Sequence, residues 1–231
     1  MRIFAHRGAS RHEPENTVAA FRAAVAMGAD GVELDVRLDA DGDLVVHHDA
    51  DLPDGRAIAG LVRSERPAAL CDLAAALAAC GHLVVNVEVK SDTVGAGVAL
   101  AAPTLAVVAA WGGQALLSSF DPDTVDELHR LAPQLPTAQL TMFPDRPLGE
   151  LVAWVAERGH VAWHPHHLLV DAEAVALAHG AGLAVNPWTV DDPDRLRALE
   201  ALGVDAVVTN DVPGALAALG RAGARGTGGG Q

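Results

Sequence analysis

The second half of the chain alternates short apolar runs with longer stretches of helical periodicity. The apolar runs begin 22 or 23 residues apart, near Ala115, Thr137, His160, Gly182 and Asp205. Two of the intervening stretches open with Asp-Pro, at 121–122 and 192–193. An Asp N-cap followed by Pro at the first helical position is a strong helix start. Strand–helix units of constant length predict parallel strands joined by right-handed crossovers.

The first half of the chain fits the same scheme. We expect strands at 2–5, 31–37, 44–47 and 83–90, and a helix at 15–27 that ends near Gly28. The Asp41-Gly42 pair predicts a hairpin turn, and a calcium loop is the weaker interpretation because its downstream Glu is missing. One of the nine candidate strands is then an excursion from an eight-stranded barrel. We predict an α/β fold, a (β/α)8 TIM-type barrel with short loops and no large inserted domain, over residues 1–222. A disordered Gly-rich tail is expected at 223–231.

Two strands alternate polar and apolar residues where a strand buried on both faces would be apolar throughout. The alternation places two polar rows on one side of their strands: Glu33, Asp35 and Arg37, and Asn86, Glu88 and Lys90. An antiparallel sheet with one solvated face would show the same alternation, but the strand–helix period favours a barrel with these rows facing its interior. Buried carboxylates require a compensating cation. Carboxylate oxygens favour Mg²⁺ or Ca²⁺ over Zn²⁺, so Glu33, Asp35 and Glu88 are candidate metal ligands.

Histidines end two of the predicted strands, where barrel enzymes keep their catalytic groups. His6 ends the first strand, and His47 and His48 end the strand at 44–47. Imidazole titrates near neutrality and can serve as general acid or general base. Adjacent residues of a strand point in opposite directions, so only one of His47 and His48 can face the site.

The charge of the chain limits its partners. Thirty acidic and sixteen basic residues give a net charge of −14, which argues against nucleic-acid and anionic membrane surfaces. We expect a small-molecule partner, no nucleic acid and no stable membrane insertion, and the sequence leaves the oligomeric state open. Cys71 and Cys80 are expected to be reduced rather than paired. No signal peptide is expected, and together these features predict a cytoplasmic protein.

An ordered set of motifs resembles the glycerophosphodiester phosphodiesterase family. The match follows the chain from end to end: His6-Arg7-Gly8, Pro14-Glu15-Asn16-Thr17, Glu33-x-Asp35, Asp41-Gly42, His48-Asp49-x-x-Leu52, Glu88-x-Lys90, Ser119-Phe120, Trp188-Thr189-Val190, and Thr209-Asn210 before Pro213. The His-Arg-Gly motif alone is weak, whereas the ordered set is highly specific. The resemblance implies a TIM-type barrel enzyme that uses a divalent cation, Mg²⁺ or Ca²⁺, to release glycerol 3-phosphate and an alcohol.

The resemblance also implies roles for individual residues. The metal ligands would be Glu33, Asp35 and Glu88, and the general base and acid would be His6 and His48. The phosphate would be held by Arg7 and Lys90, and the substrate mouth would be lined by Trp188. Glu15 would order the first loop by hydrogen bonding, or would only begin its helix.

Other interpretations stay open from the sequence. A lysophospholipase D-type phosphodiesterase would act on lipid substrates and should show an exposed apolar lip, which the sequence does not clearly reveal. A second alternative is a barrel that binds its ligand without turnover. A third is a metal-independent enzyme in which Lys90 forms a Schiff base. The His-rich stretch at 164–167 is expected to be a loop at the top of the barrel rather than a zinc site.

Overall fold

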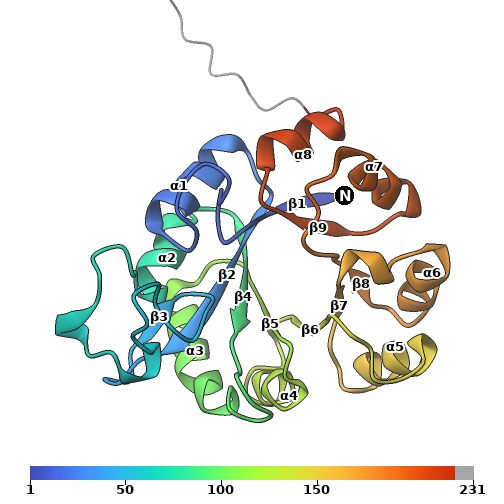
Figure 1. Cartoon of the computed structure of the whole chain (residues 1–231). Helices are drawn as coiled ribbons and strands as arrows, with labels where there is room; N and C mark the ends of the chain where they lie inside the picture. Colours follow the sequence, from blue (N-terminus) through green and yellow to red (C-terminus); the bar gives the residue numbers. More distant parts are fainter. Residues whose placement is uncertain (222–231) are drawn as a thin grey trace, which may run out of the picture.

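A computed structural model describes residues 1–221, which form a ring of parallel strands surrounded by helices (Figure 1). The strands of the ring follow the order β8-β7-β6-β5-β4-β2-β1-β9. Their bounds are β1 (Arg2–His6), β2 (Gly31–Leu38), β4 (Val84–Val89), β5 (Ala115–Ser119), β6 (Thr137–Thr141), β7 (Ala162–Pro165), β8 (Ala184–Val185) and β9 (Ala206–Thr209). The helices that cover them are α1 (Val18–Met27), α2 (Leu73–Ala79), α3 (Val98–Trp111), α4 (Pro122–Leu131), α5 (Leu148–Glu157), α6 (Ala172–Gly180), α7 (Pro193–Leu202) and α8 (Val212–Ala218).

The ring is closed between β8 and β9 by individual backbone hydrogen bonds. The Asp205 amide donates to the Val185 carbonyl at 3.0 Å, and the Val190 amide donates to the Val208 carbonyl at 2.9 Å. The eight-stranded parallel barrel predicted from the spacing of apolar runs is therefore confirmed, with no large inserted domain among the described residues. The tail predicted at 223–231 lies outside the described residues.

Of the nine predicted strands, β3 (Leu44–Val46) is the one that lies outside the ring, and it pairs antiparallel with β2. The hairpin turn before it is confirmed, with Gly42 at a φ of 81°. Asp39 Oδ1 accepts hydrogen bonds from the amides of Asp41 and Asp43, and Arg66 pairs with both Asp39 and Asp43. The acidic side chains Asp39 and Asp43 of this turn are therefore paired with arginine.

The alternating strands face their apolar rows toward the helices. Val32, Leu34 and Val36 of β2 belong to one large buried cluster together with Leu73 and Leu77 of α2. This burial leaves the polar row of β2 on the interior side of the barrel. The side on which Glu33 and Asp35 lie is thus decided by where the apolar side chains pack.

The helix expected at 15–27 begins later than predicted. α1 starts at Val18, and Thr17 is its N-cap, whose Oγ1 accepts from the Ala20 amide at 3.2 Å. Asn16 has a φ of 57°, which is left-handed and incompatible with a helix. Glu15 therefore lies in the loop before the helix, so a role at the helix start is excluded.

Two further expectations concern cysteines and membrane spans. Cys71 and Cys80 flank α2 and are both free thiols, so the prediction that they do not pair is confirmed. Burial raises the pKa of Cys71 to about 11 and that of Cys80 to about 12. Within residues 1–221 we find no helix with the length and apolar character that a bilayer crossing requires.

Gly8 lies where the loop after β1 packs directly against helix α1. Its φ is 80°, and a Cβ atom there would lie 2.7 Å from the carbonyl carbon and Cβ of Ala20. Gly28 has almost the same φ, 81°, but a Cβ atom would meet nothing within 4 Å. Substituting each glycine by alanine therefore separates the free-energy cost of the left-handed backbone from that of a steric clash.

We predict that Gly8→Ala destabilises the fold more than Gly28→Ala does. The left-handed backbone should cost either variant about 1–2 kcal/mol, and the clash should add about 1–3 kcal/mol at Gly8 alone. Urea denaturation followed by circular dichroism measures both free energies of unfolding. Equal losses for the two variants would show that the contact with Ala20 does not constrain this loop.

Candidate active site

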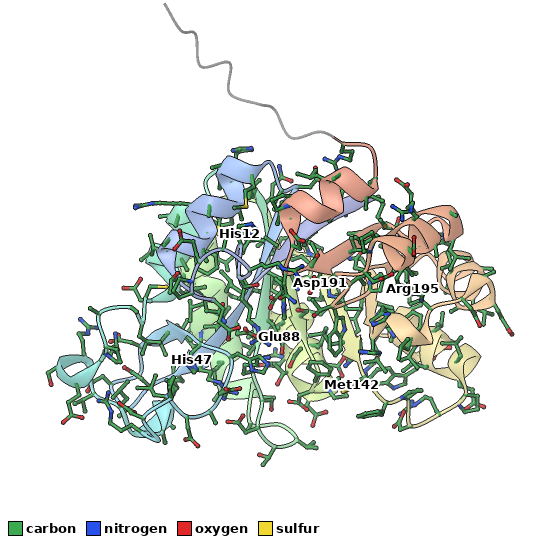
Figure 2. The ribbon with its side chains drawn as sticks, turned by 45° about the horizontal axis from the view of Figure 1, so that its top comes forward. His12, His47, Glu88, Met142, Asp191 and Arg195 are labelled. Carbon is green, nitrogen blue, oxygen red and sulfur yellow. The ribbon has the colours of Figure 1, made fainter. Side chains whose placement is uncertain are left out.

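The acidic cluster at the barrel mouth comes from two neighbouring parallel strands. Asp35 of β2 lies beside Glu88 of β4 in the strand register, and Glu33 lies one pleat below on β2. All three side chains are buried, and one carboxylate oxygen of each lies within 4.8 Å of those of the others. Figure 2 shows Glu88 at the centre of the open end of the barrel. The structure thus brings together the three residues that the alternation pattern singled out.

Two cationic side chains compensate this cluster in part. Lys90 Nζ lies 2.7 Å from Asp35 Oδ1 and 2.5 Å from Glu88 Oε1. The Arg7 amide donates to Glu33 Oε2 at 3.0 Å, and its guanidinium Nε lies 3.4 Å from Asp35 Oδ2. Asp35 is therefore approached by both cations, whereas Glu33 Oε1 is buried without a hydrogen-bond partner.

The pKa values of the carboxyls follow from this unequal compensation. Burial raises the pKa of Glu33 well above its usual value, and the charges of Asp35 and Glu88 raise it further. Burial also raises the pKa of Glu88. Burial alone would raise the pKa of Asp35 as well, but Lys90 and Arg7 outweigh it and hold that pKa at about 2. Glu33 Oε1 has no partner, and the pKa values of Glu33 and Glu88 are both raised, so the two cationic side chains do not fully compensate the carboxylates. The donor set therefore fits a hard divalent cation.

Asn16 is a site residue that sequence reasoning did not single out. Its side chain is buried, and its Nδ2 donates to Asp35 Oδ2 at 2.8 Å. The left-handed backbone at this position turns the loop so that the amide reaches β2. Its neighbour Glu15 is exposed and accepts from Arg7 Nη1 at 2.8 Å, which matches the loop-ordering hydrogen bond expected of it. The structure identifies Asn16 as a site residue by its burial and its own positive φ. In the sequence it appears only as the third residue of Pro-Glu-Asn-Thr.

His6 is held from behind by residues near the end of the chain. Its Nδ1 lies 2.7 Å from Asn210 Oδ1, so this nitrogen carries the proton and Nε2 is the acceptor. Asn210 is fixed in turn by Asp191, which accepts from its side-chain Nδ2 at 2.7 Å and from its amide at 2.8 Å. The Nε2 atom of His6 lies 3.9 Å from Glu33 Oε2. Burial and the charge of Arg7 lower the pKa of His6.

His48, and not His47, lines the same cavity as the carboxylates. Its Nδ1 lies 2.7 Å from Asp49 Oδ1, whereas His47 Nδ1 contacts the Asp49 carbonyl oxygen outside the cavity. Burial and the charge of Lys90 lower the pKa of His48, and Asp35 and Asp49 oppose this shift. The choice that the sequence left open between the two histidines is thereby decided.

Arg37 holds the segment that carries His48. Its Nε and Nη2 donate to the His48 carbonyl oxygen at 2.9 and 2.7 Å, and its Nη1 donates to both carboxylate oxygens of Asp92. The side chain follows Glu33 and Asp35 along the same face of β2. One face of β2 therefore supplies the Glu33 and Asp35 carboxylates and the arginine that holds the His48 segment.

One cavity joins most of these side chains. It is lined by His6, Arg7, Glu33, His48, Glu88, Lys90 and Trp188. Asp35 lies behind this lining, and Glu15 lies at its outer edge next to Arg7. Phe120 and Leu140 form an apolar wall, and the Phe120 ring meets the Trp188 ring edge-on at 5.3 Å between centroids. The cavity is therefore charged on the side of β2 and β4 and apolar on the side of β5 and β6.

His164, expected in the loop at the top of the barrel, belongs instead to the strand that precedes that loop. It lies in β7, is buried, and lines the cavity floor together with Asn86. Burial lowers the pKa of His164 to about 3, so the imidazole is neutral. Its Nε2 lies 2.9 Å from Asn186 Nδ2, and the Oδ1 atom of Asn86 has no hydrogen-bond partner. Neutral donors and acceptors of this kind suit hydroxyl groups of a ligand.

Comparisons with known proteins agree with this arrangement. The model of the Glycerophosphoryl diester phosphodiesterase family matches residues 6–75 and 81–213. A glycerophosphodiester phosphodiesterase of Caldanaerobacter subterraneus is 29% identical over 234 residues, which cover 90% of this chain and 93% of that protein. The structure of a putative glycerophosphoryl diester phosphodiesterase from Silicibacter pomeroyi superposes with a TM-score of 0.86 at 28% identity, covering 95% of this chain and 93% of the other. An Oleispira antarctica phosphodiesterase, solved with the product sn-glycerol-3-phosphate, shares the fold with a TM-score of 0.87 at 24% identity, over 95% and 97% of the two chains.

We predict that Arg37→Ala loosens the segment that carries His48. Hydrogen bonds from a charged donor contribute roughly 1.5–3 kcal/mol, so amide protection of His47 and Leu52 should fall by about tenfold or more. Hydrogen exchange followed by mass spectrometry measures this protection. Arg197→Ala is the control, because Arg197 pairs with Asp194 on the far helix α7. Unchanged protection in Arg37→Ala would mean that the segment is held by other contacts.

Proposed function

The chain belongs to the glycerophosphoryl diester phosphodiesterase family, and we propose that it hydrolyses glycerophosphodiesters to glycerol 3-phosphate and an alcohol with the help of a divalent cation. The observation that carries this proposal is the convergence of Glu33, Asp35 and Glu88 in a cavity flanked by His6 and His48. A relative of the same fold was solved with sn-glycerol-3-phosphate, which supports a small-molecule substrate of this class.

The cation is assigned to the oxygens of Glu33, Asp35 and Glu88. The unpartnered Glu33 Oε1 and the raised pKa of Glu33 support this assignment, because both indicate missing positive charge. Oxygen-only donors favour Mg²⁺ or Ca²⁺. When bound, such an ion supplies a Lewis acid that polarises a phosphate oxygen and orients the glycerol hydroxyls.

The two histidines are given different roles by their partners. His6 faces a neutral amide, Asn210, which keeps Nε2 free as a proton acceptor, so we assign His6 as the general base. His48 faces the carboxylate of Asp49, which stabilises the imidazolium form, so we assign His48 as the general acid. His6 then removes a proton from the nucleophile while His48 protonates the leaving alcohol as its bond to phosphorus breaks. The nucleophile is water, or the neighbouring glycerol hydroxyl by way of a cyclic phosphate, and isolation of the cyclic product would select the second route.

The remaining residues bind and orient the substrate. Arg7 and Lys90 would stabilise the negative charge that grows on the phosphate oxygens, and Trp188 would pack against the glycerol carbons on the apolar side. A Schiff-base role for Lys90 requires a lowered pKa. Burial alone would lower the pKa of Lys90, but Glu88 and Asp35 outweigh it and raise that pKa. The charged form of Lys90 therefore favours phosphate binding over imine chemistry.

The proposal is tested by measuring glycerol 3-phosphate release from a panel of glycerophosphodiesters with choline, ethanolamine and glycerol head groups. We expect turnover that chelator abolishes and that Mg²⁺ or Ca²⁺ restores. Glu33→Gln should weaken cation binding in calorimetry, whereas Glu13→Gln, in an exposed part of the same chain, should not. Full activity in chelator would rule out the cation, and absence of turnover on the whole panel would rule out the substrate class.

The same assay tests the histidines. His6→Ala and His48→Ala should each lower kcat by about 100-fold or more, the contribution of a positioned acid or base. His12→Ala is the matched control, because His12 is exposed in the loop after β1 and lies away from Glu88 (Figure 2). Near-normal turnover in either active-site variant would remove that histidine from the mechanism.

We predict that Asp49→Asn shifts the alkaline limb of the kcat profile to lower pH. The Asp49 hydrogen bond raises the pKa of His48 against the effect of burial, so its removal lowers that pKa further. A general acid must be protonated, and activity should therefore be lost first at high pH. Asp51→Asn removes a neighbouring exposed charge and serves as the control. An unchanged alkaline limb in Asp49→Asn would mean that His48 is not the acid.

A further inference from the structure

The floor of the catalytic cavity carries two buried polar side chains that end in free atoms. Asn86 of β4 is 2% exposed, and its Oδ1 has no hydrogen-bond partner within residues 1–221. His164 of β7 is equally buried, and its Nδ1 has no partner in the same part of the chain. Both side chains line the cavity. Buried polar atoms are nearly always hydrogen-bonded, so two free ones in the lining of a functional cavity indicate a ligand that pairs with them.

The two free atoms have opposite hydrogen-bonding character. Asn186 Nδ2 lies 2.9 Å from His164 Nε2. An amide nitrogen only donates, so Nε2 is the acceptor and the proton of the neutral imidazole is on Nδ1. Burial lowers the pKa of His164 to about 3 and so keeps the ring neutral. His164 therefore offers a free N–H donor, and Asn86 offers a free amide oxygen as acceptor. A hydroxyl group suits this pair, because it can accept from one atom and donate to the other.

The partner of these atoms must come from the cavity side. Two positions earlier on the same strand faces are Val84 and Ala162. Val84 packs against the apolar cluster that contains Phe4, and Ala162 belongs to another apolar cluster together with Leu116 and Ala138. These apolar side chains close the barrel beneath the floor. Asn86 and His164 are thus the boundary between an apolar barrel core and the polar cavity above it.

The floor lies directly beside the acidic cluster. Asn86 is next to Glu33 in the register of β4 and β2, and Glu88 follows it two positions later on the same face of β4. Trp188 Nε1 donates to the His164 carbonyl oxygen at 2.8 Å, so the ring assigned to the glycerol carbons is anchored at His164. A glycerol with its hydroxyls at the acidic cluster and its carbons against Trp188 therefore has Asn86 and His164 beneath it.

We propose that Asn86 and His164 are specificity-determining residues that recognise a free hydroxyl of the glycerol, with Asn86 as the acceptor and His164 as the donor. This inference rests on the proposed function of the same site. The enzyme then selects phosphodiesters of an alcohol that carries this hydroxyl, because the corresponding deoxy alcohol leaves both buried atoms unpaired. A site built to hydrogen-bond a hydroxyl rejects the analogue that lacks it far more strongly than an apolar pocket rejects a missing methylene.

The test compares sn-glycerol 3-phosphate with two analogues that each lack one hydroxyl, 3-hydroxypropyl phosphate and 2-hydroxypropyl phosphate. Calorimetry measures the affinity of each ligand in saturating Mg²⁺ or Ca²⁺, and inorganic phosphate is the reference ligand without an alcohol. Asn86→Leu removes the free oxygen and nearly conserves the shape of the side chain. Thr104→Val is the matched control, because Thr104 is fully buried in α3, its Oγ1 also has no partner within residues 1–221, and it lies outside the cavity lining.

The unmodified enzyme should bind at least one deoxy analogue about 100-fold or more less tightly than sn-glycerol 3-phosphate. In Asn86→Leu this ratio should fall about tenfold or more, because the analogue no longer leaves a buried acceptor unpaired. The affinity for inorganic phosphate should stay within about twofold, and Thr104→Val should leave every ratio unchanged. The kcat/KM values for phosphocholine diesters of the same three alcohols should follow the same order.

Thermal unfolding followed by circular dichroism checks the fold of each variant. Asn86→Leu should melt at the same temperature as the unmodified enzyme or higher, because the oxygen that it removes has no partner to lose. His164→Phe removes the donor and should lower the same selectivity ratio. Its melting temperature should fall, because Asn186 loses its partner.

Other results overturn the inference in distinguishable ways. An unchanged ratio in Asn86→Leu would mean that water alone pairs with the two atoms, and the proposed function would stand. A parallel loss of affinity for inorganic phosphate and for the metal ion would make Asn86 a cation ligand instead of a hydroxyl acceptor. Equal affinities of the unmodified enzyme for all three alcohol phosphates would exclude recognition of a hydroxyl. Turnover of none of the three diesters would contradict the proposed function itself.

Discussion

The structure is organised around the close approach of three buried carboxylates at the mouth of the barrel. Glu33, Asp35 and Glu88 place oxygens within 4.8 Å of one another, and such a concentration of negative charge is unstable without compensation. Lys90, the Arg7 guanidinium and the Asn16 amide all point at this cluster. The loop after β1, with its two left-handed non-glycine residues, Arg7 and Asn16, brings the guanidinium and the amide to the cluster.

The two histidines at the cavity show how different hydrogen-bond partners would give similar side chains different chemistry. His6 is backed by Asn210, which lies 204 positions along the chain and is itself fixed by Asp191. His48 is backed by the adjacent Asp49, and its backbone carbonyl is held by Arg37. A neutral partner keeps an imidazole available as a base, and an anionic partner stabilises its protonated form. The hydrogen-bond partners, rather than the histidines themselves, would therefore divide the acid and base roles.

The expectations that depend on local pattern agree best with the structure. The constant spacing of apolar runs gave the barrel, and alternation along β2 and β4 placed Glu33, Asp35 and Glu88 on one side of their strands. The predicted start of α1 was wrong by three residues, because the sequence Glu15-Asn16 does not indicate that Asn16 has a left-handed backbone, which a helix cannot contain. His164 was expected in a loop at the top of the barrel, whereas the closed barrel buries it at the end of β7.

The direction of a side chain along a strand follows from the period of the backbone, so the residue pattern alone indicates which side chains could share the barrel interior. It also determined the acidic character of the site, since no helix-facing position could hold those carboxylates. Which histidine faces the cavity and which residue supports His6 depend instead on how the chain folds in three dimensions. These relations join loops that follow different strands, and such loops come together only when the barrel closes.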